Sequence, residues 1–148
     1  MSTVKEMLDV KGRELWSIES SQSIHEAVGL MEARGVGALT ILEDDRMVGI
    51  ISEGDCARQV ILQNKPADST SVADIMATNV VFVSENTSAD KCMSLMNQKK
   101  IRHLPVMEGE ELVGIITVGD LMKFIVKKQS MTIEELESYI MDETGGSG

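Results

Sequence analysis

The chain has 148 residues, of which 43% are hydrophobic, and a formal net charge of −10. This length fits one compact domain or two small units packed around a shared core, and the charge excludes a nucleic-acid binder that works by broad neutralisation of phosphates. No apolar run approaches the ~18 residues that a membrane span requires, and the N-terminus lacks the pattern of a secretion signal, so we expect a cytoplasmic protein with no membrane partner.

The first predicted elements are a short extended segment and an amphipathic helix. The extended segment is Leu15–Ile18. Ser23 and Glu26 have the spacing of a capping box and predict that a helix begins after Ser23. Its apolar face would be formed by residues at positions i, i+3, i+4 and i+7, namely Ile24, Ala27, Val28 and Met31.

Two strands joined by a short polar turn follow this helix. They are predicted at Ala38–Leu42 and Met47–Ser52. Asp55 comes directly after the second strand, where the N-cap of another helix is expected. The unit therefore has the order β-α-β-β-α.

The same order returns in the second half of the chain. The segment Met47–Asp55 is repeated 65 positions later as Leu112–Asp120, with the strand, the hydroxyl residue, the glycine and the aspartate all kept. Val4–Leu8 pairs with Val72–Met76 if the first copy carries about three extra residues around Gly12, so one of these segments opens each copy. The second copy has an extended segment at Val80–Val83, followed by a helix capped by Thr87 or Ser88. Its two strands are predicted at Leu104–Met107 and Leu112–Thr117.

This duplication predicts an α/β fold of two β-α-β-β-α repeats around a pseudo-twofold axis with a common core. We expect repeats at residues 1–64 and 72–128, joined by a linker at residues 65–71. Residues 129–148 carry several acidic and no basic side chains and are expected to form an acidic C-terminal helix and a disordered tail.

The first candidate site is the polar segment at the end of the second strand of the hairpin, which is repeated in both copies. A hydroxyl at Ser52 or Thr117, free backbone N–H groups and a carboxylate at Asp55 or Asp120 would meet at one strand edge. A carboxylate accepts hydrogen bonds from vicinal hydroxyls, and a helix N-terminus favours phosphate oxygens. The alternative is that both aspartates only cap helices and both hydroxyls only end strands.

The second candidate site is a basic segment at the start of the predicted strand Leu104–Met107. Lys99–Pro105 contains Arg102 and His103, and arginine binds phosphate through two parallel hydrogen bonds. The two lysines of this segment could instead only face solvent at a helix C-terminus. The matching segment of the first copy, Arg34–Ala38, has a single cation, so two non-equivalent clefts are predicted.

Nothing in the sequence indicates catalysis. Cys56 and Cys92 occupy non-equivalent positions in the repeat and lack neighbours at zinc-ligand spacing, so they are expected to be reduced thiols. There is no nucleophile–base pair, metal cluster or phosphate loop, and we expect neither an enzyme nor a required cofactor.

These motifs resemble a tandem pair of CBS domains, the Bateman module. The resemblance covers Val4 to Lys128 and is carried mainly by Val72–Met76, Lys100–Val106 and the two Gly-Ile-Ile-Ser/Thr-x-Gly-Asp segments. It implies repeats packed sheet against sheet with two clefts between them, a flat homodimer, and an adenosine-bearing ligand such as AMP, ADP, ATP, NADH or S-adenosylmethionine.

The resemblance also assigns roles to individual residues. Asp120 and Asp55 match the aspartate that holds the ribose hydroxyls, and Thr117 and Ser52 match the hydroxyl that faces the ribose or phosphate. Arg102 and His103 match the basic pair near the phosphates. Gly54 departs from the pattern, because many stand-alone members carry an arginine there, and Arg58 would partly replace it. The cleft of Asp120, Thr117 and the Arg102 strand is therefore expected to be occupied in preference.

The resemblance implies a regulatory, energy-sensing module. Because no catalytic or DNA-binding domain fits beside two repeats in 148 residues, the effector that reads the ligand state is expected to be another protein. The alternative is a ligand-independent scaffold for dimerisation and partner binding, which the glycine at position 54 favours.

Overall fold

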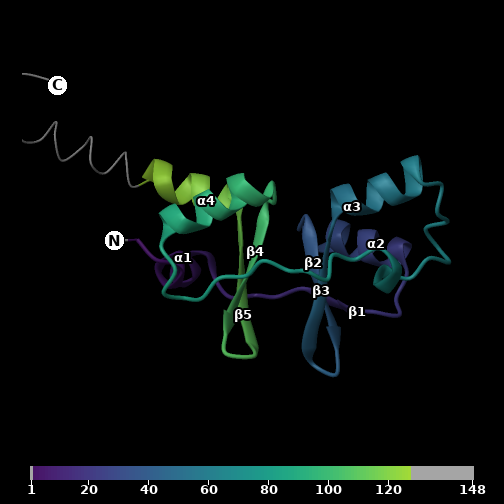
Figure 1. Cartoon of the computed structure of the whole chain (residues 1–148), viewed down its shortest axis with the longest axis horizontal. Coiled ribbons are helices and arrows are strands. Elements are labelled where there is room, and N and C mark those ends of the chain that lie inside the picture. Colours follow the sequence, from purple (N-terminus) through teal and green to yellow (C-terminus); the bar gives the residue numbers. More distant parts are fainter. Residues whose placement is uncertain (1, 128–148) are drawn as a thin grey trace, which may run out of the picture.

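The computed structural model describes residues 2–127 of the chain (Figure 1). The first half contains α1 (Val4–Lys11), β1 (Ser17–Glu19), α2 (Ile24–Arg34), β2 (Ala38–Glu43), β3 (Arg46–Ser52), α3 (Glu53–Ala57) and the π-helical turn η1 (Arg58–Leu62). The second half contains the short 3₁₀ helix η2 (Val72–Asp74), α4 (Ala89–Lys99), β4 (His103–Glu108), β5 (Glu111–Thr117) and helical residues 118–127. The expected C-terminal helix and tail lie outside the described residues.

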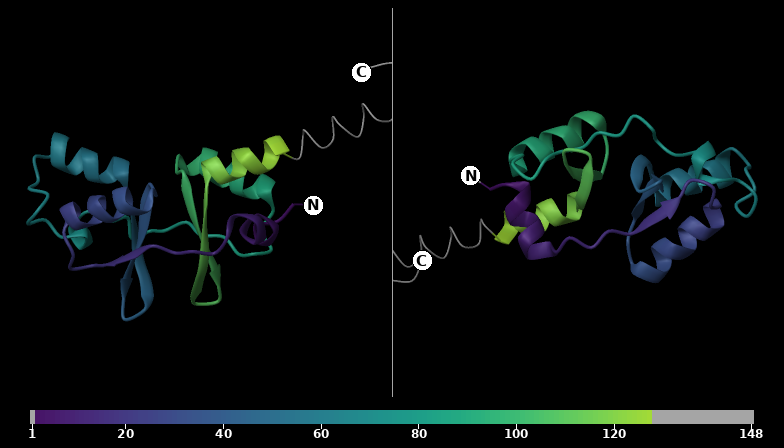
Figure 2. Two further views of the ribbon diagram at one scale, coloured as in Figure 1. Left: turned by 180° about the vertical axis from the view of Figure 1, so that it is seen from behind. Right: turned by 90° about the horizontal axis from the view of Figure 1, so that it is seen from below.

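Two small sheets stand side by side in the centre of the molecule. In the first sheet β1 runs parallel to β2, and β2 pairs antiparallel with β3. In the second, β4 pairs antiparallel with β5, and Val83 adds only a single parallel bridge to Val106 where β1 lies in the first copy. Helices α1 and α4 lie outside one hairpin, and α2 and α3 lie outside the other (Figures 1 and 2). The expected arrangement of two repeats is confirmed.

The predicted starts of α2 and α4 are confirmed by their capping bonds. Ser23 and Glu26 form a capping box at α2, in which the Ser23 hydroxyl accepts from the Glu26 backbone N–H at 3.1 Å. At α4 the capping residue is Ser88, whose hydroxyl accepts from the Lys91 backbone N–H. Local side-chain-to-backbone bonds of this kind satisfy N–H groups that have no partner inside the helix, so their spacing is readable from the sequence.

The buried residues form two clusters, and the segments that open the repeats are exchanged between them. Val4, Met7 and Leu8 of α1 are buried in the cluster formed by the second copy. Val72 is buried in the cluster of the first copy, with Met76 packed against it. The single shared core expected from the sequence was therefore wrong: each copy has its own core, which is completed by the segment that precedes the other copy.

Two mid-strand glycines accommodate the exchanged segments. A Cβ at Gly114 would lie 2.8 Å from Leu8 Cδ2, and a Cβ at Gly49 would lie 2.6 Å from Met76 Sδ. Glycine within a strand often marks such a close approach. The two contacts occupy equivalent positions in the repeat, so the exchange obeys the pseudo-twofold symmetry.

Within residues 2–127, the structure contains no helix that is both long enough and apolar enough to cross a membrane.

Candidate functional site

Two cavities lie where the repeats meet, and both are lined by residues of both copies. The Asp55 cleft, of about 610 Å³, is lined from the first copy by Ser52, Gly54, Asp55 and Arg58 and from the second by Lys100, Arg102 and His103. The Asp120 cleft, of about 600 Å³, is lined by Thr117, Asp120 and Ile115 together with Lys11, Trp16 and Arg34. Both volumes lie within the range of small-molecule sites.

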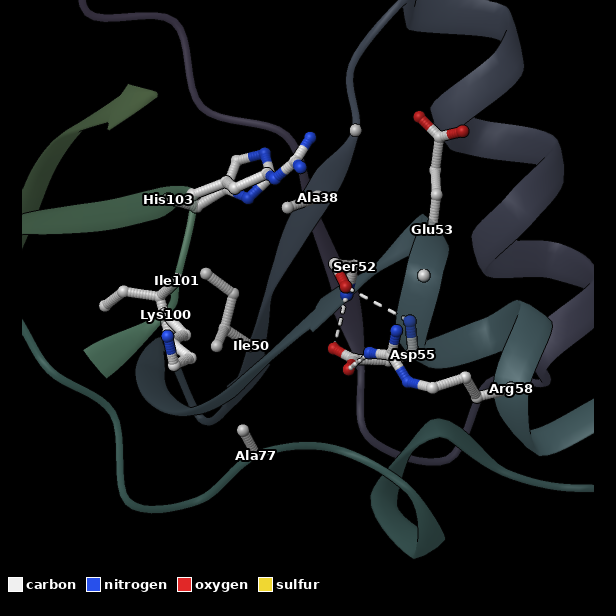
Figure 3. A pocket seen from close by; sticks show the side chains of 13 residues that line it. Ala38, Ile50, Ser52, Glu53, Asp55, Arg58, Ala77, Lys100, Ile101 and His103 are labelled. Atoms are coloured by element: carbon white, nitrogen blue, oxygen red, sulfur yellow. Dashed lines mark hydrogen bonds and ion pairs between the residues drawn. The ribbon is translucent and has the colours of Figure 1, made fainter. Parts of the chain in front are cut away.

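In the Asp55 cleft, β3 runs directly into α3 through a capping box. The Ser52 hydroxyl accepts from the Asp55 backbone N–H at 3.2 Å, and Asp55 Oδ2 accepts from the Ser52 backbone N–H at 3.0 Å (Figure 3). Thr117 and Asp120 make the same two bonds, at 3.0 and 2.9 Å. The expectation that the aspartates are N-caps was therefore wrong: Ser52 and Thr117 are the caps, because their hydroxyls reach the N–H three residues on, and the aspartates return the bond.

Arg58 lies beside the glycine that departs from the family pattern. Its guanidinium donates from Nη2 to Asp55 Oδ1 at 2.7 Å. A Cβ at Gly54 would lie 3.1 Å from Arg58 Nη1. The guanidinium of Arg58 therefore occupies the space into which a side chain at position 54 would extend.

In the basic segment around the start of β4, Lys100 and Arg102 line the Asp55 cleft and not the Asp120 cleft, whereas His103 lines both. Lys100 and His103 approach the Asp55 cleft from the second copy, opposite the Asp55 carboxylate (Figure 3), and Arg102 lines the same cleft. The predicted grouping of Arg102 with Asp120 and Thr117 was therefore wrong. The reason is that the segments before β2 and β4 cross between the copies: residues 100–103 line the cleft of Asp55, and residues 34–38 line the cleft of Asp120.

His103 is the member of the basic pair that belongs to both cavities. Burial lowers the pKa of His103 below its ordinary value, and the nearby Lys11 ammonium lowers it further, against the opposing effect of Asp120, Asp55 and Glu53. The imidazole is therefore neutral at pH 7, and the permanent positive charge of the Asp55 cleft comes from Arg58, Lys100 and Arg102.

The Asp120 cleft contains a cation that the sequence did not reveal. Lys11, the last residue of α1, donates from Nζ to Asp120 Oδ2 at 2.5 Å and to the Ile115 carbonyl at 2.6 Å. Burial acts to raise the pKa of Asp120, but the hydrogen bonds from Lys11 and from Thr117 outweigh it and hold the pKa below its ordinary value. No motif marks Lys11, since it reaches this cleft only because α1 packs on the second copy.

Trp16 contributes an aromatic ring to the lining of the Asp120 cleft. The Arg34 guanidinium carbon lies 4.2 Å from the centroid of the Trp16 ring, which is a cation–π contact. Trp16 lines the Asp120 cleft and does not line the Asp55 cleft. The two clefts thus combine equivalent carboxylates and hydroxyls with different surroundings.

Both clefts are equipped for binding through hydrogen bonds and charge. The ionised aspartate of each capping box can accept further hydrogen bonds from the two hydroxyls of a diol. Arginine and lysine side chains can donate hydrogen bonds to an anionic group such as a phosphate. Among residues 2–127, no group of three or more His, Cys, Asp or Glu side chains has the arrangement of a metal site. Burial raises the pKa of the Cys56 and Cys92 thiols to about 11, so both are protonated at neutral pH.

Comparison with known proteins identifies the architecture. The sequence profile of the CBS domain family matches residues 6–61 and 72–127. The mitochondrial CBS domain-containing protein CBSX3 of Arabidopsis thaliana is 30% identical over 94% of this chain and 72% of its own. The CBS domain-containing protein YhcV of Bacillus subtilis is 33% identical over 82% of this chain and 84% of its own.

Solved structures agree with the sequence relatives. The CBS-domain containing protein ATU1752 of Agrobacterium tumefaciens superposes with a TM-score of 0.79 at 36% identity, covering 82% of this chain and 98% of that one. The CBS domain pair of protein MJ0100, solved in complex with 5′-methylthioadenosine and S-adenosyl-L-methionine, gives a TM-score of 0.77 at 26% identity, covering 86% and 98% of the two chains.

Proposed function

The chain belongs to the CBS domain family and carries two CBS domains in tandem, and from this membership we propose that it is a regulatory module that binds an adenosine-containing nucleotide between its repeats. The observation that carries the proposal is the duplicated capping box, which presents an aspartate at the edge of each cleft. The adenosine ligands of the MJ0100 pair support the ligand class. The candidate nucleotides are AMP, ADP and ATP, and NADH and S-adenosylmethionine are the alternatives.

In this proposal Asp55 and Asp120 hold ribose hydroxyls, and Ser52 and Thr117 keep each carboxylate in place. Arg58, Arg102 and His103 act near the phosphates of a ligand in the Asp55 cleft. Since three permanent cations line that cleft, we rank the Asp55 cleft above the Asp120 cleft as the principal nucleotide site. This reverses the ranking expected from the sequence.

The proposed signal is a change in how the repeats pack on each other or on a second copy. Each cleft is lined by both repeats, so a ligand stabilises the arrangement that brings both linings within reach. A ligand shifts such an equilibrium only by its differential affinity for the two arrangements. The effector that reads the change is a separate protein.

Thermal unfolding in the presence of AMP, ADP, ATP, NADH and S-adenosylmethionine tests this function. A ligand at a hundred times its dissociation constant adds about 2.7 kcal/mol to the free energy of unfolding, and several degrees to the midpoint. We expect at least one of these compounds to give such a shift and the double variant Asp55→Asn/Asp120→Asn to lose it. If no compound moves the midpoint at millimolar concentration, the nucleotide proposal fails and the scaffold function takes its place.

The scaffold candidate is favoured by one exposed apolar edge. Ile61 and Leu62 of η1 are 70% and 66% exposed, and Met122 and Val126 in the helical residues 118–127 are 57% and 58% exposed. These two helices lie on the same edge of the molecule, away from the hairpin turns (Figure 1). We propose that this edge joins two copies in a homodimer, with or without nucleotide.

Light scattering tests the dimer. The chain is expected to scatter as a particle of twice its 16.2 kDa mass. The variant Ile61→Glu/Met122→Glu should scatter as a monomer, because it places a charge on each helix of the apolar edge. The control is Phe82→Glu, at an apolar residue that is 58% exposed outside these helices, and it should remain dimeric. A wild-type chain that is monomeric at micromolar concentration contradicts this proposal.

A further inference from the structure

The two helices that lead into β2 and β4 end with different residues in the same conformation. The C-cap residue that follows α2 is Gly35, with φ 65 and ψ 36, and the C-cap residue that follows α4 is Lys100, with φ 54 and ψ 47. The two residues are 65 positions apart and therefore equivalent in the repeat. Glycine adopts this left-handed conformation without steric cost, whereas a lysine is disfavoured there. Strain of this kind in a cleft-lining residue points to a function that outweighs stability.

A second basic residue of the Asp55 cleft, Arg102, also has no basic equivalent in the first copy. Arg102 lines the Asp55 cleft, and its equivalent is Gly37. Within residues 2–127, neither Lys100 nor Arg102 makes a side-chain hydrogen bond or an ion pair, so both cations are available to a ligand.

The cations of the Asp120 cleft are already engaged within the protein. Lys11 donates to Asp120 and to the Ile115 carbonyl, and Arg34 lies over the Trp16 ring. Glu14 lines this cleft and Glu53 lines the Asp55 cleft, so the two linings carry equal numbers of carboxylates and differ in their available cations. Each additional phosphate of a ligand would therefore find new partners in the Asp55 cleft but not in the Asp120 cleft.

We propose that the two clefts select adenosine ligands by phosphate charge, with Lys100 and Arg102 as the specificity-determining residues. The Asp55 cleft takes nucleoside di- and triphosphates in preference, and the Asp120 cleft takes an adenosine ligand with one phosphate or none. This inference rests on the proposed function, because it assigns a ligand class to each of the same two clefts.

Calorimetric titration with adenosine, AMP, ADP and ATP tests the inference in two backgrounds. Asp120→Asn leaves the Asp55 cleft intact, and in this variant the affinity should rise roughly tenfold from AMP to ATP and should fall as salt is added. Asp55→Asn leaves the Asp120 cleft intact and should show no such rise. Asparagine keeps an acceptor oxygen for the capping bond, so both variants are expected to fold.

A reciprocal exchange at the helix ends isolates the role of Lys100. In the Asp120→Asn background, Lys100→Gly should reduce the preference for ATP and at the same time raise the unfolding midpoint, because glycine relieves the left-handed strain. In the Asp55→Asn background, Gly35→Lys should increase the preference for ATP. A merely structural role of Lys100 would change the midpoint and leave the order of affinities unaltered, which would overturn the inference.

Trp16 provides a second readout on the unmodified chain. It is the only tryptophan of the protein and lines the Asp120 cleft alone. Adenosine should change its fluorescence, while ATP at concentrations that saturate the calorimetric signal of the Asp55 cleft should not. If the affinities of both clefts depend on the number of phosphates in the same way, the inference is overturned but the proposed function is not. Absence of all binding by the wild-type chain overturns the proposed function as well, so the two failures are distinguishable.

Discussion

Asp55→Asn should remove most of the thermal stabilisation that ATP confers on this chain, and Asp120→Asn should remove much less. Asp55 stands among three permanent cations, Arg58, Lys100 and Arg102, which attract the phosphates of a nucleotide whose ribose the carboxylate would hold. Each aspartate already has an internal cationic partner, Lys11 for Asp120 and Arg58 for Asp55. The expected difference therefore rests on Lys100 and Arg102, which line the Asp55 cleft, do not line the Asp120 cleft and are unpaired within residues 2–127.

The expected size follows from the loss of a charged acceptor. Hydrogen bonds to a charged group contribute about 1.5–3 kcal/mol, so binding should weaken roughly 10- to 150-fold. At a ligand concentration of a hundred dissociation constants, a hundredfold loss reduces the stabilisation from about 2.7 to about 0.4 kcal/mol. The measurement is the unfolding midpoint of each variant with and without ATP.

The two variants control each other, because both replace an aspartate that closes a capping box. Asparagine can still accept the backbone N–H of Ser52 or Thr117, so the intrinsic midpoints should change by similar small amounts. If Asp120→Asn instead abolishes the shift caused by ATP while Asp55→Asn preserves it, the ranking of the clefts derived from the structure is contradicted.

Leu8→Ala should lower the free energy of unfolding by about 2–5 kcal/mol, the usual cost of a cavity left by a buried leucine. Leu8 is fully buried, and its side chain packs against the backbone at Gly114 in the second copy. For a chain of this size the midpoint should fall by about 5–15 °C, as measured by calorimetry. The control is Val10→Ala on the same helix, since Val10 is 72% exposed and its loss leaves no cavity.

Hydrogen exchange on Leu8→Ala tests the exchange of the opening segments between the repeats. Because α1 completes the core of the second copy, strands β4 and β5 should lose protection before β2 and β3. Met76→Ala is the mirror-image variant and should expose β2 and β3 first, since Met76 packs against the core of the first copy. Loss of protection in the opposite order would mean that each opening segment stabilises its own repeat.

The duplication, the order of the elements and the starts of α2 and α4 could be read from the sequence because their signals are local. The capping box joins Ser23 to Glu26, three residues on, and the apolar run that ends at Ser52 lies within one strand. Strong local patterns in two ordered copies define the repeat and limit the ways in which it can fold. The same patterns identified both aspartates and both hydroxyls as candidate site residues.

The pairing of one repeat with the other depends on contacts between residues far apart in the chain. In a duplicated chain each segment has two equivalent places to pack, so the sequence does not distinguish Arg102 beside Asp120 from Arg102 beside Asp55. The pseudo-twofold selects the second arrangement, and it also brings Lys11 to Asp120 by packing α1 on the second copy. Local sequence therefore defines the repeat and its polar residues, whereas packing across the axis assigns a different set of charges to each cleft.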